Sequence, residues 1–87
     1  MAERDHVIVA LHVKDRVKQA VGIQRILTEF GSMIRTRLGL HEVDDRAGAG
    51  KGIILLEMVG GGDRVEAMVR KLRGCKGVEV KKVVFTH

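Results

Sequence analysis

The sequence has 87 residues, of which 45% are hydrophobic and 31% charged, and its formal net charge is +5. This length gives one domain with a single two-layer core and leaves no room for a second domain. The longest apolar run is far below the roughly 20 residues that a membrane-spanning helix needs, and the first residues lack signal-peptide character. The lone Cys75 cannot form the paired disulfides of a small secreted domain. We therefore expect a cytoplasmic protein that does not enter a membrane.

The positive charge permits a polyanionic partner, because basic surfaces attract phosphates through counterion release. Acidic and apolar residues separate most of the basic ones, which indicates an ordinary solvated surface. The segment that most resembles a basic patch lies late in the chain and contains Arg64, Arg70, Lys71, Arg73 and Lys76, followed by Lys81 and Lys82. Contact of this segment with nucleic acid stays open.

The first predicted unit is a strand followed by a helix. Asp5 to Val13 alternates as a strand does. Its core-facing residues are Val7, Val9, Leu11 and Val13, and its opposite face carries His6, Ile8, Ala10 and His12. A helix is predicted from about Val17 to Phe30, capped by Asp15 and ended by Gly31. Its apolar stripe consists of Val17, Ala20, Ile23, Leu27 and Phe30.

Two strands joined by a polar hairpin are predicted next. Met33 to Val43 returns to period two and indicates a half-buried strand. Its apolar side is Ile34, Thr36, Leu38 and Leu40, and its polar outer side is Arg35, Arg37, Gly39 and His41. Asp44 to Gly50 supplies turn residues for a long hairpin. Lys51 to Val59 is apolar at nearly every position, which predicts a strand covered on both faces.

The last unit is a second helix and a fourth strand. Gly60 to Gly62 breaks the chain, and Asp63 followed by Glu66 resembles a capping box. Apolar residues then recur with helical spacing at Val65, Met68, Val69 and Leu72. Gly74 ends this helix, and Val78 to Phe85 alternates as a final strand.

The order βαββαβ predicts one α+β domain over residues 1–87, a ferredoxin-like sandwich. Right-handed crossovers give a four-stranded antiparallel sheet of order 4-1-3-2, with both helices on one face. The strand that begins at Lys51 then lies in the middle. Its outer face forms an apolar patch with Ile8, Ala10, Val83 and Phe85, and monomers seldom leave such patches exposed. We expect a homo-oligomer, a dimer or a tetramer, formed by this face or by strand edges.

No catalytic pattern is visible, and we predict neither an enzyme nor a cofactor. Cys75 has Lys76 beside it but no histidine near it in the sequence, so we interpret it as a small loop or core residue. Gly60 to Gly62 matches neither a Walker loop nor a dinucleotide fingerprint. The chain has two Phe, no Tyr and no Trp, which disfavours RNA stacking on the sheet. Direct DNA binding is not expected either, since one sandwich uses the whole chain.

The four histidines fall near strand ends: His6, His12, His41 and His87. The predicted sheet brings His87 near His6, and it places His12 and His41 on one face. These last two are two strand spacings apart, on the order of 10 Å, which is too far for one zinc ion without help from an oligomer. There is no CxxC or HxH, so we predict no metal site.

A resemblance rests on short segments in a fixed order: His6-Val7-Ile8-Val9, Val13-Lys14-Asp15-Arg16, Ile34-Arg35-Thr36-Arg37-Leu38-Gly39, Gly52-Ile53-Ile54-Leu55 and Gly77-Val78-Glu79-Val80-Lys81. Over nearly its whole length the chain resembles the bacterial family of iron-only hydrogenase system regulators. That family is similar in fold to ACT domains and to the C-terminal domain of the nickel-responsive repressor. Both oligomerise and bind small effectors.

The resemblance implies a small regulatory or sensor module that is oligomeric and binds an effector at a subunit interface. The candidate effector site is Lys14, Asp15 and Arg16 in the first loop, with His12 and His41 beside it. Lys14 and Arg16 would hold an anionic or carboxylate ligand, whereas Asp15 would mainly cap the helix. The competing hypothesis is a structural adaptor that binds a protein partner and no ligand.

Overall fold

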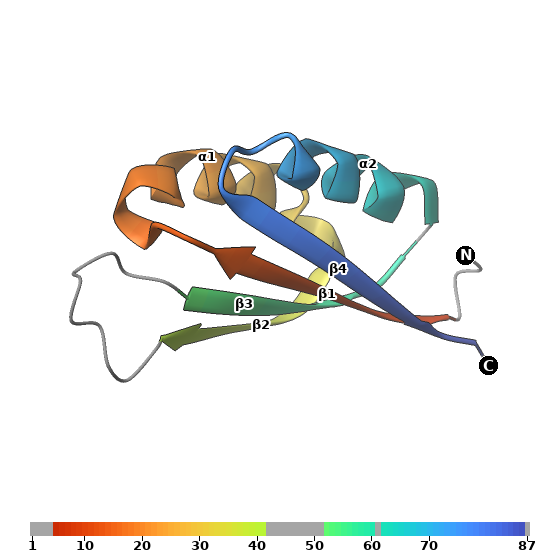
Figure 1. Ribbon diagram of the computed structural model, residues 1–87. Coiled ribbons are helices and arrows are strands. Elements are labelled where there is room, and N and C mark those ends of the chain that lie inside the picture. The colour runs from red at the N-terminus through yellow and green to blue at the C-terminus, as the bar shows by residue number, and fades with distance from the viewer. Residues whose placement is uncertain (1–4, 42–51, 61, 87) are drawn as a thin grey trace.

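Two helices lie on one side of a four-stranded antiparallel sheet (Figure 1). The computed structural model describes residues 5–41, 52–60 and 62–86, so the predicted hairpin Asp44 to Gly50 lies outside the described residues. The elements are β1 (His6–Val13), α1 (Arg16–Glu29), a 3-10 turn (Gly31–Met33), β2 (Ile34–His41), β3 (Gly52–Met58), α2 (Gly62–Arg73) and β4 (Val78–Phe85). The strand order is β2-β3-β1-β4, which is the predicted order read from the other edge. The predicted α+β architecture is confirmed.

The core lies between the sheet and the helices, as the alternation of β1 predicts. The buried strand residues are Val7, Val9, Leu11, Val13, Leu56, Met58 and Val80. The helices contribute Ile23, Leu27, Val65, Met68, Val69 and Leu72, and the residue that ends α1, Phe30, is buried with them. Ala20 was expected in the stripe of α1 but is exposed. The reason is that α1 packs on the core through the turns from Ile23 to Phe30, with Ile26 as a partly buried member.

The predicted faces of β2 are wrong beyond its first residue. The strand pairs Ile34 with Met58, Thr36 with Glu57, Leu38 with Leu55 and Leu40 with Ile53. A bulge between Ile34 and Thr36 inserts one extra residue, and a shift of one residue exchanges the two faces of a strand. Ile34 therefore packs against the core, but Leu38 lies on the side away from the helices and is 50% exposed. Arg37 turns toward α1, where its Nη1 donates to Gln24 Oε1 at 3.1 Å.

The predicted capping box of α2 does not form. The helix begins at Gly62, so Asp63 lies inside the first turn. Its negative charge there still interacts favourably with the positive end of the helix dipole. Glu66 instead accepts a hydrogen bond from Lys82 of β4. This bond lowers the pKa of the Glu66 carboxyl and links the second helix to the edge strand.

Phe30 joins the C-terminal end of α1 to α2. The Arg64 guanidinium lies 5.4 Å and the Lys71 ammonium 5.6 Å from the centre of its ring. Lys71 also donates to both carboxylate oxygens of Glu29, at 2.7 and 2.9 Å. Cation-π contacts of this kind contribute about 0.5–1 kcal/mol each at exposed sites.

In the part of the chain that the structure describes, no helix has the length and apolar character needed to span a bilayer.

Candidate functional site

The first loop connects β1 to α1 and carries the predicted site residues Lys14 and Asp15. The backbone N–H of Lys14 donates to the carbonyl of Gly77 at 3.1 Å, which fastens the loop to the connection between α2 and β4. Asp15 is extended, and its Oδ1 accepts from the N–H of Lys18 at 3.1 Å. Its predicted role as the helix cap is confirmed, so its carboxylate has a structural function. Arg16 is the first residue of α1, and its side chain lies outside the described part of the structure.

The structure does not bring His12 and His41 together on one face. His12 pairs with Ile53 on the side of the sheet away from the helices. His41 pairs with Gly52, which in turn pairs with the core residue Val13, so its register position is on the helix side. The bulge in β2 causes this difference, and the prediction that the two histidines share a face was wrong. His87 lies outside the described residues, and no cluster of potential metal ligands occurs among those described.

An open depression of about 500 Å³ lies beside the first loop. Its lining comes from the start of α1 and from the connection between α2 and β4: Asp15, Lys18, Gln19, Gly22, Cys75, Lys76 and Gly77. Gln19 joins the two walls, because its Oε1 accepts from the N–H of Asp15 at 3.2 Å and its Nε2 donates to the carbonyl of Lys76. The tertiary fold thus adds Lys18, Gln19 and Lys76 to the predicted set.

The charged residues that line the depression are Lys18 on the α1 side, Lys76 on the other side, and Asp15 between them. The N-terminus of α1 adds the positive end of the helix dipole, and the Asp15 carboxylate caps that end by accepting from the N–H of Lys18. Cys75 is partly buried, and its thiol contacts the carbonyl of Lys71 at 3.7 Å. Among the described residues, no acid or base side chain is hydrogen-bonded to that sulfur.

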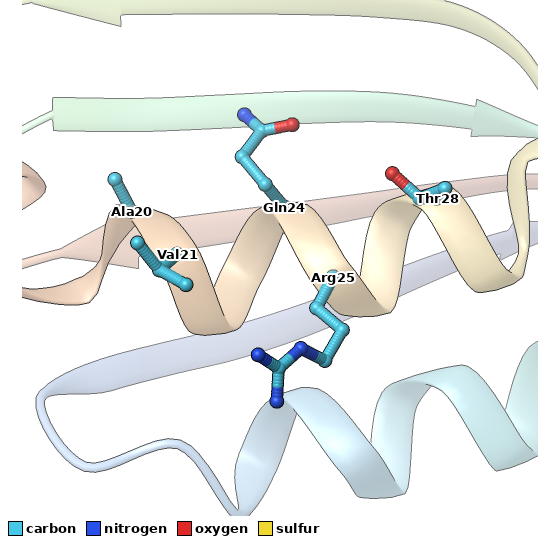
Figure 2. Close-up of a pocket in the computed structure, with 5 residues that line it drawn as sticks. All are labelled: Ala20, Val21, Gln24, Arg25 and Thr28. Carbon is cyan, nitrogen blue, oxygen red and sulfur yellow. The ribbon is translucent and has the colours of Figure 1, made fainter.

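Figure 2 shows a second open groove along the outer side of α1. It is lined by Ala20, Val21, Gln24, Arg25 and Thr28. Gln24 points toward the sheet edge, where it accepts from Arg37 of β2. Arg25 is the one titratable group in this lining. A single cation beside two apolar side chains, an amide and a hydroxyl offers no acid-base pair, so we assign no chemistry to this groove.

The side of the sheet away from the helices carries both apolar and polar side chains, and we call it the open sheet face. Strand pairing places these described residues on it: His6, Ile8, Ala10, His12, Thr36, Leu38, Ile53, Leu55, Glu57, Glu79, Lys81, Val83 and Phe85. Three polar groups form a cluster near one end. Glu57 Oε1 accepts from the Thr36 hydroxyl at 2.8 Å, and His6 Nε2 lies 2.6 Å from Glu57 Oε2.

This cluster sets the acidity of Glu57. The Thr36 hydroxyl is the largest cause and His6 the next, and together they lower the pKa of Glu57 below its ordinary value of 4.5. Because the pKa of Glu57 is lower in the folded protein than in the unfolded one, its carboxylate stabilises the fold at pH values above the unfolded-state pKa. That contribution is lost as the pH falls through the folded pKa, so the relevant window lies below pH 4.5.

We expect Thr36→Val to raise the pKa of Glu57 toward its ordinary value, because the hydroxyl donor is removed. The measurement is an NMR pH titration of the Glu57 side-chain carboxyl carbon. Thr28→Val, on the outer side of α1, is the matched control and leaves this titration unchanged. An unaltered midpoint in Thr36→Val would contradict the assigned cause.

Comparison with known proteins places the fold but gives no activity. No protein-family model matches the chain, and no curated protein matches it. It is similar to the uncharacterized protein TM1266 from Thermotoga maritima, with 27% sequence identity and a TM-score of 0.80. That match covers 95% of this chain and all of the other. It is also similar to the de novo designed protein Foldit4, with 22% identity, a TM-score of 0.55, and coverage of 95% and 97%. This second likeness concerns the fold alone.

Proposed function

We propose that this chain is a small oligomeric regulatory module that binds an anionic effector in the depression beside the first loop. The observation that carries the proposal is that Lys18 and Lys76, which are far apart in the sequence, both line one depression at the start of α1. Lys14 is exposed one residue before the helix cap and adds a third cation to this end of the domain. Amide groups at a helix N-terminus and nearby lysines are a common setting for carboxylate and phosphate groups.

The regulatory part of the proposal rests on sequence resemblance. The segments Val13–Arg16 and Arg37–Gly39 resemble those of the iron-only hydrogenase system regulators, as described above. We propose the same type of role for this chain in the cytoplasm, exerted through a protein partner rather than by direct DNA contact. The effector would bind between the start of α1 and the connection from α2 to β4, which also hold the first loop. Binding there would change the surface that a protein partner contacts.

The test is thermal unfolding with inorganic phosphate and with citrate as probes. A ligand that binds only the folded state stabilises it by about 2.7 kcal/mol at 100 times its Kd, so we expect Tm to rise with probe concentration. The double variant Lys18→Ala and Lys76→Ala should lose this rise. The matched control is Arg70→Ala together with Arg73→Ala, which also removes two positive charges, from exposed positions of α2 that do not line the depression. It should keep the rise.

Salt effects are separated from binding by the same variants. Phosphate also stabilises proteins by exclusion from their surface, and that effect is equal in all of them. An equal rise in wild type, double variant and control would contradict the effector site. So would the absence of any rise in the wild type with either probe.

A second candidate is an adaptor that binds a protein and no ligand, and the exposed apolar side chains of the open sheet face favour it. Native mass spectrometry of the purified protein distinguishes the two. An oligomer that carries additional mass supports the effector-binding module and identifies the class of ligand. An oligomer of bare chains that also shows no thermal response to the probes supports the adaptor.

A further inference from the structure

The open sheet face exposes large apolar side chains from three of the four strands. Leu38 of β2 is 50% exposed, Ile53 of β3 40%, and Val83 and Phe85 of β4 are 48% and 56% exposed. Figure 1 shows both helices on the opposite side, with no described helix beneath the sheet. Strand pairing puts Ile8, Ala10 and Leu55 between these residues, so the apolar surface runs across the whole sheet.

The open sheet face is close to electrically neutral, although the chain carries +5. With histidines counted as neutral, as in that total, Glu57, Glu79 and Lys81 leave the described residues of this face with a charge of −1. The basic residues of α2 lie in the other layer, and Lys82 turns to that side to bind Glu66. A polyanion would therefore find no positive field on this face. A second copy of the chain would bring one negative charge to the contact, so charge repulsion between the two faces is small.

The size of the face fits a small dimer interface. Four strands about 4.8 Å apart, with residues about 3.3 Å apart along each, span on the order of 400 Å² of flat area. Protruding side chains enlarge the accessible area toward the roughly 800 Å² per partner of a standard interface. Pairing through strand edges would leave these side chains in water, whereas packing of one face on another covers them.

We propose that two copies of this chain pack face to face through the open sheet face. The contact is isologous, since the same surface serves both copies, and the two sheets lie about 10 Å apart as in other sheet sandwiches. This inference deepens the oligomer of the proposed function by assigning its surface and its occupant. It is independent of the anion site, which lies on the helix side of the sheet.

The test measures the molar mass in solution by light scattering and the dimer dissociation constant by sedimentation. Wild-type protein is expected to dissociate to monomers on dilution with a measurable Kd. Val83→Lys and Leu38→Lys bury an unpaired charge in the dimer and should raise Kd by at least about tenfold, equivalent to about 1.4 kcal/mol. Phe85→Ser removes apolar contact without adding charge and should raise it less.

Val21→Lys is the matched control, because it makes the same change at a valine that is 71% exposed on α1. It should keep the wild-type Kd. All three face positions are exposed in the monomer, so far-ultraviolet circular dichroism of each variant should match that of the wild type. This check keeps loss of the dimer distinct from loss of the fold.

Two outcomes would overturn the inference in different ways. A wild-type dimer that survives Val83→Lys and Leu38→Lys unchanged would show that another surface, such as a strand edge, holds the oligomer. The proposed oligomeric module would then stand and the assigned face would fall. A wild-type protein that is monomeric at every concentration would contradict both the oligomeric module and the assigned face. If that monomer kept its thermal response to phosphate or citrate, the anion site would still stand.

Discussion

Leu72→Ala is expected to lower the free energy of unfolding by about 2–5 kcal/mol, because it leaves a cavity in a packed core. Leu72 lies on α2, is 0% exposed and belongs to the single cluster of buried apolar residues. Small domains have total stabilities of about 5–15 kcal/mol, so this one change removes a large part of the total. Urea denaturation followed by circular dichroism measures the difference.

Arg73→Ala is the control for this experiment, since it changes the next residue of the same helix on its exposed side. Surface changes of this kind usually stay within about 0.5 kcal/mol. A similar loss in both variants would mean that the effect comes from the helix itself rather than from the core. That result would contradict the packing of α2 on the sheet.

Left-handed backbone costs a residue with a Cβ about 1–2 kcal/mol. We expect Gly77→Ala to lower the free energy of unfolding by more than this. Gly77 has a φ of +81°, and a Cβ at this position would lie 1.8 Å from Gln19 Nε2. Gln19 would have to leave the carbonyl of Lys76, and the two walls of the depression would lose their connection. Thermal unfolding of the single variants Gly77→Ala and Gln19→Ala and of the double variant gives the coupling between the two sites.

The double variant should cost less than the sum of the single ones, because without the Gln19 amide only the backbone strain remains. Gly22→Ala is the control with the opposite sign. Gly22 lies inside α1, and an added Cβ would meet no atom within 4 Å, so alanine should stabilise the helix by up to about 1 kcal/mol. Equal effects of the two glycine replacements would contradict this account of Gly77.

The order of the elements could be predicted from the sequence because each depends on a local period. Val7, Val9, Leu11 and Val13 repeat every second residue and are buried in β1. Val65, Met68, Val69 and Leu72 repeat with helical spacing and are buried in α2. Asp15 could be assigned as a cap because its partner, the N–H of Lys18, is three residues away. All these interactions lie within one element, so the sequence alone determines them.

The tertiary structure decided the features that depend on distant segments or on register. The bulge in β2 moves Leu38 to the face opposite the predicted one and puts the register positions of His41 and His12 on different faces. Alternation along one strand cannot reveal this extra residue. The depression likewise depends on contact between the start of α1 and the connection before β4, through Gln19 and Lys76. The sequence therefore determined the elements and their order, while pairing between strands and contacts between loops decided which side chains share a surface.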